Sequence, residues 1–392
     1  MQDTDCPHVS SRCNEMTSFL VMDILEAAQR LERQGKNIIH MEIGEPDFDT
    51  PECVKEAACR ALADNKTHYT HSLGIPELRE AVCEHYLDQY GVEVHPDQII
   101  VTQGTSPAMF VLFSSLLERG DKVVVSDPCY ACYSNFIRFP GGEPLPVRVR
   151  EDDAFQYRPE AIAHCLEQHP KAIMLNSPSN PTGTLLSAER MRAIAEMGRG
   201  DGPWLVSDEI YHGLVYEGRE HSILEFTDKA FVFNGFSKLY AMTGWRLGYL
   251  IAPKAFIRPM QKLCQNFFIS ANAPAQWGGV AALREAGQDV QEMKARYDRR
   301  RKYMLQRLRG MGLRIDNEPT GAFYILVDFN HLSGDSLALA YDMLEKAHIG
   351  VTPGIDFGPG AEGYLRFSYA TSLENITEGM DRLERYLAEH QK

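Results

Sequence analysis

The sequence predicts an α/β fold whose central β-sheet is mainly parallel. Short apolar runs that end in Gly, Asn, Asp or Ser alternate with longer segments of helical period. The runs are apolar throughout, which is typical of strands buried on both faces of a parallel sheet. With 392 residues, of which 44% are hydrophobic and 24% charged, the chain is long enough for two or three domains.

The elements of this sheet can be assigned in order along the chain. The expected strands are Ile99–Thr102, Val123–Ser126, Ala172–Asn176, Trp204–Ser207, Phe231–Phe233 and Leu247–Ile251, and the expected helices are Pro107–Glu118, Ser187–Met197 and Phe256–Phe268.

From about Gln276 the sequence changes to a long, charged helical stretch, followed by strand-like Ala322–Val327 and Tyr364–Ser368. This change predicts a large domain, 46–275, and a smaller C-terminal α+β domain, 276–392. The first 45 residues are too few to fold alone, so we expect segment 1–45 to pack on the smaller domain.

Composition excludes several classes of partner. Forty Lys plus Arg against 54 Asp plus Glu give a net charge of 40 − 54 = −14, which opposes binding to nucleic acid or to anionic membranes. No stretch reaches the roughly 20 apolar residues of a membrane span, and the N-terminus lacks the features of a signal peptide. A cytoplasmic protein is therefore expected.

The cysteines and a run of basic residues near position 300 do not indicate a separate functional site. The nine cysteines form no paired framework, and the CxxC from Cys129 to Cys132 lacks a second ligand pair, so we expect reduced thiols and no metal site. The basic run from Arg296 to Arg309 is interpreted as a solvated face of a helix.

Polar residues follow the expected strands, where ligands of open α/β sheets bind. These positions are Gly104-Thr105-Ser106, Asp127-Pro128, the segment from Asn176 to Asn180, Asp208-Glu209 and Ser237-Lys238. The sequence therefore predicts a binding site at this edge of the sheet.

Lys238 is a candidate nucleophile, because a lysine buried near the sheet loses hydration and shifts toward its neutral form. A surface lysine is the alternative. Asp208, at the end of another run, could hold a ring nitrogen in its protonated state, or it could simply cap a helix. Tyr211 lies three residues further on, either on the same side or packed in the core.

A phosphate seat is predicted at Gly104-Thr105-Ser106, because the free N–H groups and the dipole of the following helix favour an anion there. Arg246 could add a charged contact or form a surface salt bridge. Asn180 lies in a Pro- and Gly-containing turn and offers both donors and acceptors. Arg366 alternates with apolar residues on an expected strand, so it either binds a carboxylate bidentately or forms an edge-strand salt bridge.

Taken together, the motifs resemble the class I and II aminotransferases, the aspartate aminotransferase-like branch of fold type I pyridoxal phosphate enzymes. The resemblance runs over nearly the whole chain. It is carried by IGEPDFDTP at Ile43–Pro51, HYTHSLGIPELREA at His68–Ala81, NSPSNPTG at Asn176–Gly183, SDEIY at Ser207–Tyr211, SKLYAMTGWRLGY at Ser237–Tyr249, PTGAFY at Pro319–Tyr324 and LRFS at Leu365–Ser368.

The resemblance implies a three-layer sandwich and a catalytic role for Lys238, Asp208 and Tyr211. Lys238 would carry pyridoxal 5′-phosphate as a Schiff base and move the proton at the substrate Cα. Asp208 would pair with the ring nitrogen, while Asn180 and Tyr211 would bind the 3′-oxygen. Two half-reactions in ping-pong order would follow, with pyridoxamine phosphate between them.

The resemblance also implies the remaining contacts. Tyr69 would reach the phosphate of the neighbouring subunit, which implies a homodimer with shared active sites, and Tyr130 would stack on the cofactor ring. The phosphate would be held by Thr105, Ser106, Ser237 and Arg246, and the substrate carboxylate by Gly44 and Arg366 with help from Asn180.

One departure bears on the substrate. Members that favour aspartate often have a lysine in the turn after the phosphate-seat glycine, where this chain has Ser106. We therefore expect a neutral or aromatic amino donor, with a 2-oxo acid such as 2-oxoglutarate as acceptor.

Three other functions remain possible from the sequence. A carbon–sulfur β-lyase would use the same lysine, aspartate and arginine. A transcription regulator with an aminotransferase-like domain would need an added DNA-binding domain, and the acidic balance opposes it. A catalytically inactive binding protein would not need the candidate catalytic residues, all of which are present.

Overall fold

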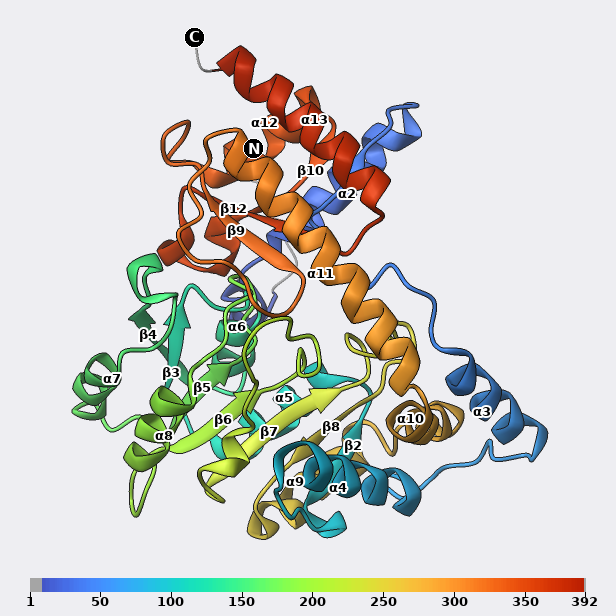
Figure 1. Ribbon diagram of the computed structural model, residues 1–392. Helices are drawn as coiled ribbons and strands as arrows, with labels where there is room; N and C mark the ends of the chain where they lie inside the picture. Colours follow the sequence, from blue (N-terminus) through green and yellow to red (C-terminus); the bar gives the residue numbers. More distant parts are fainter. Residues whose placement is uncertain (1–8, 391–392) are drawn as a thin grey trace, which may run out of the picture.

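The computed structural model describes residues 9–390, and it has a wide lower part built on a large sheet and a narrower upper part (Figure 1). Residues 1–8 and 391–392, which belong to the expected N-terminal segment and C-terminal domain, lie outside the described residues. The expected domain boundaries remain a prediction; helix α10 (Ala273–Glu285) spans the one at residue 275 and packs on helices of the lower part.

The lower part contains a seven-stranded sheet with the order β2-β8-β7-β6-β5-β3-β4. Only β8 runs antiparallel to its neighbours, so the predicted α/β class with a mainly parallel sheet is confirmed. Its strands are β2 (Ile99–Thr102), β3 (Lys122–Asp127), β4 (Glu143–Arg148), β5 (Ala172–Asn176), β6 (Trp204–Asp208), β7 (Ala230–Gly235) and β8 (Gly248–Ile251).

Strand β4 is the one strand of this sheet that the sequence analysis missed. It carries Pro144 and Pro146, which cannot donate to a ladder, and half-exposed residues interrupt its apolar pattern. An edge strand tolerates these prolines because it pairs on one side only, here with β3.

Alternate residues of the strands point to opposite faces of the sheet and pack in two separate hydrophobic cores. The sheet is therefore the middle of three layers. On β2, for example, Ile99 and Val101 belong to one core and Ile100 to the other. Helices cover both faces (Figure 1). They are α3 (Glu52–Ala63), α4 (Pro76–Tyr90), α5 (Thr105–Leu116), α6 (Tyr133–Arg138), α7 (Pro159–Leu166), α8 (Ala188–Met197), α9 (Lys254–Phe267) and α10.

The upper part has its own sheet and core. The three strands β9 (Tyr324–Asp328), β11 (Thr352–Pro353) and β12 (Tyr364–Ser368) pair in the antiparallel order β11-β12-β9. Close to the start of the described chain, β1 (Ile39–His40) pairs with β10 (Ile349–Gly350), and α2 (Leu20–Arg33) packs on the same core. The other helices of this part are α12 (Ser336–Lys346) and α13 (Leu373–His390). The short helix α1 (Ser11–Asn14) lies by the end of α6 instead, where the Arg12 guanidinium is 6.0 Å from the centre of the Phe139 ring. Short 3₁₀ turns are η1 (Pro96–Gln98), η2 (Glu151–Asp153), η3 (Ile223–Glu225), η4 (Gly354–Phe357) and η5 (Pro359–Ala361).

The interpretation of the basic run as a solvated helix face is wrong for its middle. Helix α11 (Gly287–Gly310) crosses from the lower to the upper part (Figure 1), and its buried face includes Arg300 and Arg301 beside apolar residues such as Tyr297 and Met304. Arg301 is fully buried and pairs with Asp298 and Glu217, while Arg300 forms a two-pronged ion pair with Asp47 at 2.7 and 2.8 Å. A buried arginine needs such acidic partners, and the local sequence pattern does not indicate which residues they are.

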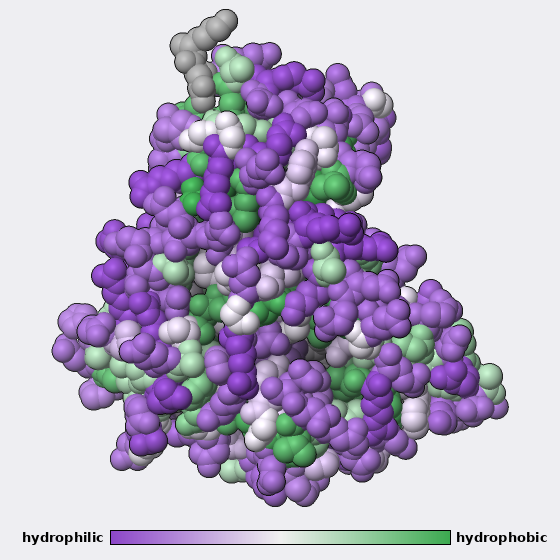
Figure 2. Space-filling model, viewed as in Figure 1, coloured by the Kyte–Doolittle hydropathy of each residue, from purple (hydrophilic) through white to green (hydrophobic). Residues whose placement is uncertain are grey.

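Described residues contain no helix that is long and apolar enough to cross a membrane, and no group of side chains arranged to hold a metal ion. Cysteines between residues 9 and 390, including Cys129 and Cys132, are all free thiols. The surface is mostly hydrophilic on the face shown in Figure 2, with small, scattered hydrophobic areas.

Candidate active site

A cavity of about 320 Å³ lies where the carboxyl ends of the large sheet face the upper part of the molecule. Its walls come from the ends of β5 and β6, the start of α5, the loop after β7, and the upper strands β9 and β12. Eleven of the twelve residues predicted for the site line it: Gly44, Thr105, Ser106, Tyr130, Asn180, Asp208, Tyr211, Ser237, Lys238, Arg246 and Arg366. Tyr69 does not; its side chain is 82% exposed.

One end of the cavity is built to receive an anion. Helix α5 starts at Thr105, two residues earlier than expected, so the N–H groups of its first turn point at this end. Pro107 fits within that turn because its missing N–H would have had no partner there. Gly104 has φ of +95°, and a side chain on it would meet the Arg246 guanidinium at 2.7 Å. A glycine is therefore required for Arg246 to lie beside the helix start.

Lys238 lines the cavity, and its Nζ donates a hydrogen bond of 2.6 Å to the carbonyl oxygen of Gly44. Burial lowers the pKa of Lys238 to about 8, although the nearby Glu45 acts in the opposite direction. The surface-lysine interpretation is thus wrong. A good fraction of this amine is neutral, and therefore nucleophilic, near pH 8.

Asp208 is buried at the end of β6 and is held at both oxygens. The Tyr133 hydroxyl donates to its Oδ2 at 2.7 Å, and the backbone N–H of Ile210 donates to its Oδ1 at 3.2 Å. Burial raises the pKa of Asp208 to about 6, and the hydrogen bond from Tyr133 opposes this rise. The carboxyl group is therefore mostly ionised above pH 6. It caps no helix, because a turn follows it.

Arg366 is buried in β12, the central strand of the upper sheet, so the edge-strand alternative is wrong. Its guanidinium donates to the Asn180 side chain at 2.8 Å and to the carbonyl oxygen of Glu42 at 2.6 Å. The buried Nε has no hydrogen-bond partner among the described residues. An unpaired buried donor beside a cavity fits the binding of an anionic ligand.

Two tyrosines that the sequence analysis did not assign complete the polar wall. The Tyr324 hydroxyl lies 2.8 Å from that of Tyr211, and the Tyr324 ring lies 4.2 Å from the Arg366 guanidinium carbon. Tyr133 follows β3 and lies three residues after Tyr130, so its place after a strand was a usable signal. Tyr324 is the first residue of β9, and only the packing of the two parts brings it here.

The apolar wall comes from a place that gave no sequence signal. Phe19, Val21 and Met22, at the start of α2, line the cavity, and Phe19 meets the Tyr130 ring edge-on at 6.0 Å. Two other apolar side chains, Ile43 and Met109, also line the cavity.

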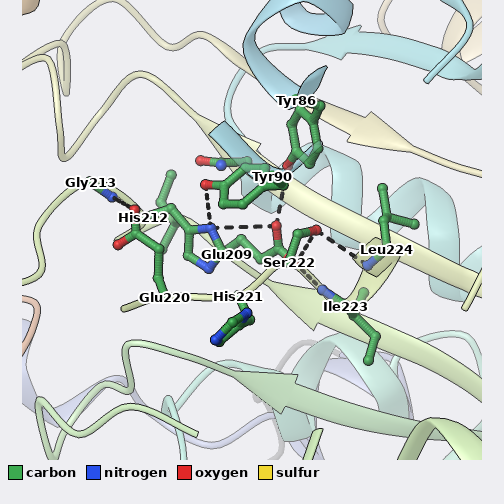
Figure 3. Close-up of polar contacts among 12 residues, drawn as sticks. Tyr86, Tyr90, Glu209, His212, Gly213, Glu220, His221, Ser222, Ile223 and Leu224 are labelled. Carbon is green, nitrogen blue, oxygen red and sulfur yellow. Dashed lines mark hydrogen bonds and ion pairs between the residues drawn. The ribbon is translucent and has the colours of Figure 1, made fainter. Parts of the chain in front are cut away.

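A buried polar cluster lies just outside the cavity (Figure 3). At its centre is Glu209, the residue after Asp208, which has no exposed surface and does not line the cavity. Burial raises the pKa of Glu209 to about 8.

The fold and these side chains define a fold type I enzyme that depends on pyridoxal phosphate. An anion seat, a buried carboxylate and a reactive amine occur together in one cavity, and they match the phosphate, the ring nitrogen and the aldehyde of that cofactor. The model of the family described as aminotransferase class I and II matches residues 36–383. The chain belongs to this family, so it is a pyridoxal phosphate-dependent aminotransferase.

Relatives agree with this assignment over the whole chain. A (5-formylfuran-3-yl)methyl phosphate transaminase of Methanocaldococcus jannaschii is 43% identical, over 97% of this chain and 99% of that one. An aspartate/prephenate aminotransferase of Thermus thermophilus is 39% identical, over 97% and 98%. A crystal structure of a Methanococcus jannaschii protein, whose active site is described as similar to kynurenine aminotransferases, superposes with a TM-score of 0.89 at 42% identity, over 97% and 100%.

Proposed function

We propose that this aminotransferase moves the amino group of a neutral or aromatic amino acid to a 2-oxo acid such as 2-oxoglutarate, in ping-pong order. The carrying observation is the composition of the cavity wall. Its cationic residues are Lys238, Arg246 and Arg366, each of which already has a role in this proposal, and its wall at α2 is apolar. No further cation in the described lining meets a side-chain carboxylate.

The residues of the cavity divide into three groups. Thr105, Ser106, Ser237 and Arg246 hold the cofactor phosphate. Asp208 binds the ring nitrogen, Asn180 and Tyr211 bind the 3′-oxygen, and Tyr130 stacks on the ring. The substrate α-carboxylate binds to Arg366, next to Asn180 and the backbone of Gly44.

The cofactor, when bound, supplies an aldehyde that condenses with amines and a ring that withdraws electrons from the substrate Cα–H bond. Lys238 anchors it through Nζ. When an amino acid takes that place, the freed Lys238 amine would accept the proton from the substrate Cα and deliver it to the former aldehyde carbon of the cofactor. Arg366 and Asn180 fix the carboxylate, which keeps the Cα–H bond within reach of Lys238. Tyr130 and Phe19 cover the site and exclude water.

We further propose a homodimer in which Tyr69 binds the phosphate of the neighbouring active site. Tyr69 lies outside its own cavity and is 82% exposed in the single chain. Phe267 and Ile269 are also exposed, at 62% and 47%, and a second copy of the chain would cover such apolar surface.

Known relatives support the aromatic part of the proposal in part only. The Methanococcus structure is described as similar to kynurenine aminotransferases, whereas the Thermus relative is named for aspartate and prephenate. The donor must therefore be tested directly.

A donor panel in single-turnover assays tests the proposal. We expect phenylalanine, tyrosine, leucine or methionine to react at least about tenfold faster than aspartate, because a buried carboxylate without a partner is costly. Aspartate as the best donor would contradict the proposed specificity. Replacing Lys238→Ala is the matched control, and it should abolish turnover with every donor.

The same assay without a 2-oxo acid separates transamination from carbon–sulfur β-elimination. A transaminase releases one equivalent of oxo acid per active site and then stops. Continued release of pyruvate and ammonia from cysteine would indicate the lyase reaction instead.

A further inference from the structure

We propose that Glu209 is a positioning residue that holds the turn carrying Asp208 and Tyr211 in place from outside the cavity. The inference rests on the proposed roles of those two residues. Glu209 lies between them in the chain. Asp208, Ile210 and Tyr211 all line the cavity, whereas Glu209 does not. Its carboxyl group therefore acts on the site only through the backbone of this turn.

The Glu209 side chain is fixed from two other elements (Figure 3). The Ser222 hydroxyl and the backbone N–H of Ile223, at the start of η3, both donate to Oε1 at 3.0 Å. The Tyr86 hydroxyl, on α4, donates to Oε2 at 3.2 Å. A completely buried carboxyl group is costly unless it is hydrogen-bonded, so these donors confine it to one position.

The backbone of Glu209 is also hydrogen-bonded at both its N–H and its carbonyl group. The Glu209 N–H donates to the Phe233 carbonyl at 2.8 Å, and the Glu209 carbonyl accepts from the His212 N–H at 2.9 Å. The His212 ring nitrogen Nδ1 lies 3.6 Å from Oε2 and accepts or donates a 2.8 Å hydrogen bond with Tyr90. Side chain and backbone of Glu209 thus connect β7, α4 and η3 to the turn.

Such a connection matters because catalysis depends on small distances. Asp208 makes its own hydrogen bonds to Tyr133 and Ile210, and Tyr211 contacts Tyr324, but none of these contacts anchors the turn to α4 or η3. A displacement of about 1 Å in a catalytic group can reduce the rate by about a hundredfold.

Three variants of the holoenzyme test the inference: Glu209→Ala, Glu209→Gln and, as a matched control, Tyr157→Phe. Tyr157 is a buried tyrosine whose hydroxyl donates to the Met174 carbonyl of the same sheet at 3.0 Å, away from the turn. Each variant is examined by visible circular dichroism of the bound cofactor, by kcat and KM with the best donor, and by thermal unfolding.

Glu209→Ala should lower kcat by about tenfold or more with little change in KM, and should change the visible dichroism. Glu209→Gln should restore both to near wild type, because its carbonyl oxygen can accept from Ser222 and Ile223 while its amide donates to Tyr86. Tyr157→Phe should lower Tm alone.

Two results would overturn the inference. One is a Glu209→Ala enzyme with unchanged kcat and dichroism, whatever its Tm. The other is a Glu209→Gln enzyme as impaired as the alanine variant, because position would then not be the cause. If Glu209→Ala does not fold, Tyr86→Phe and Ser222→Ala each remove one donor. Both must then slow kcat and change the dichroism, and wild-type values in both would reject the role.

The dichroism is measured without substrate, so a wrong assignment of the amino donor leaves this test intact. A wild-type protein that shows no cofactor band would instead contradict the proposed function.

Discussion

Burial shifts the pKa values of Lys238 and Asp208 in opposite directions, to about 8 and about 6. Burial always disfavours the charged form, so it lowers the pKa of an amine and raises that of a carboxyl group. Between these two values Asp208 is mostly ionised while Lys238 is mostly protonated, and only above pH 8 are both in the forms that the chemistry needs.

The first residue prediction concerns the capture of the cofactor by Lys238. Only the neutral amine attacks an aldehyde, so the rate at which cofactor-free protein takes up pyridoxal phosphate should rise with pH through about 8. Stopped-flow absorption between pH 6 and pH 9.5 measures this rate.

Glu45→Gln provides the control, since Glu45 raises the pKa of Lys238. The plot of uptake rate against pH for Glu45→Gln should have its inflection at a lower pH than the plot for the wild type. A rate that does not change between pH 7 and 9 would contradict the assignment of Lys238.

The second residue prediction concerns Tyr133. Its hydrogen bond to Asp208 lowers the pKa of that carboxyl group, so Tyr133→Phe should raise the pKa. A hydrogen bond to a charged group contributes about 1.5–3 kcal/mol, so the acidic limb of the pH profile of kcat/KM should move up by about one to two pH units. Activity at pH 6 should fall more than activity at pH 8.

An equal loss of activity at both pH values would mean that Tyr133 acts by packing and not on the charge of Asp208. Tyr157→Phe removes a buried hydroxyl that donates to the Met174 carbonyl and not to Asp208, so it should leave the profile unchanged.

At the scale of elements, α2 depends on a distant residue for its start. Its own cap residue, Phe19, makes no capping hydrogen bond. Instead the Asp356 carboxylate, in η4, accepts from the N–H groups of Leu20 and Val21 at 2.9 and 3.2 Å. Because Phe19, Val21 and Met22 line the cavity, this contact links the stability of α2 to the shape of the substrate wall.

Asp356→Ala should therefore lower the free energy of unfolding by about 1 kcal/mol and raise KM for the amino donor several-fold. Steady-state kinetics and chemical denaturation measure the two effects. Ser187→Ala is a suitable comparison, because Ser187 caps α8 by accepting from the Arg190 N–H at 3.3 Å and lies away from the cavity. Ser187→Ala should lower the free energy of unfolding without a change in KM. If Asp356→Ala has the KM of the wild type, the start of α2 does not influence substrate binding.

At the scale of the whole molecule, the proposed sharing of active sites can be tested by mixing two variants. Lys238→Ala removes the lysine of its own site, and Tyr69→Ala removes the tyrosine that serves the neighbouring site. In a mixed dimer one site then has both lesions and the other has none. Refolding the two together should give about a quarter of wild-type activity, since about half of the dimers are mixed and each has one intact site.

Neither variant alone should reach that value. If mixing gives no more activity than the average of the two variants, Tyr69 does not serve a neighbouring site.

The parallel sheet and most of the site follow from local patterns in the amino-acid sequence. Apolar runs specify buried strands, and residues directly after parallel strands must lie at one edge, so Asp208, Asn180 and the turn at Thr105 were expected to lie together. Strand β4 was not predicted, because its prolines and half-exposed residues interrupt the apolar pattern of a buried strand.

The residues that face this edge from the rest of the chain depend on how distant segments pack. Phe19 and Tyr324 reach the cavity from segments more than eighty residues away from its sheet-edge residues, and Asp356 caps α2 across the upper part. Arg300 and Arg301 are buried because their side chains meet Asp47, Glu217 and the carbonyl of Pro319, which lie far from them in the sequence. Contacts of this kind depend on how separate elements pack, and local sequence patterns contain only the preferences of each element alone.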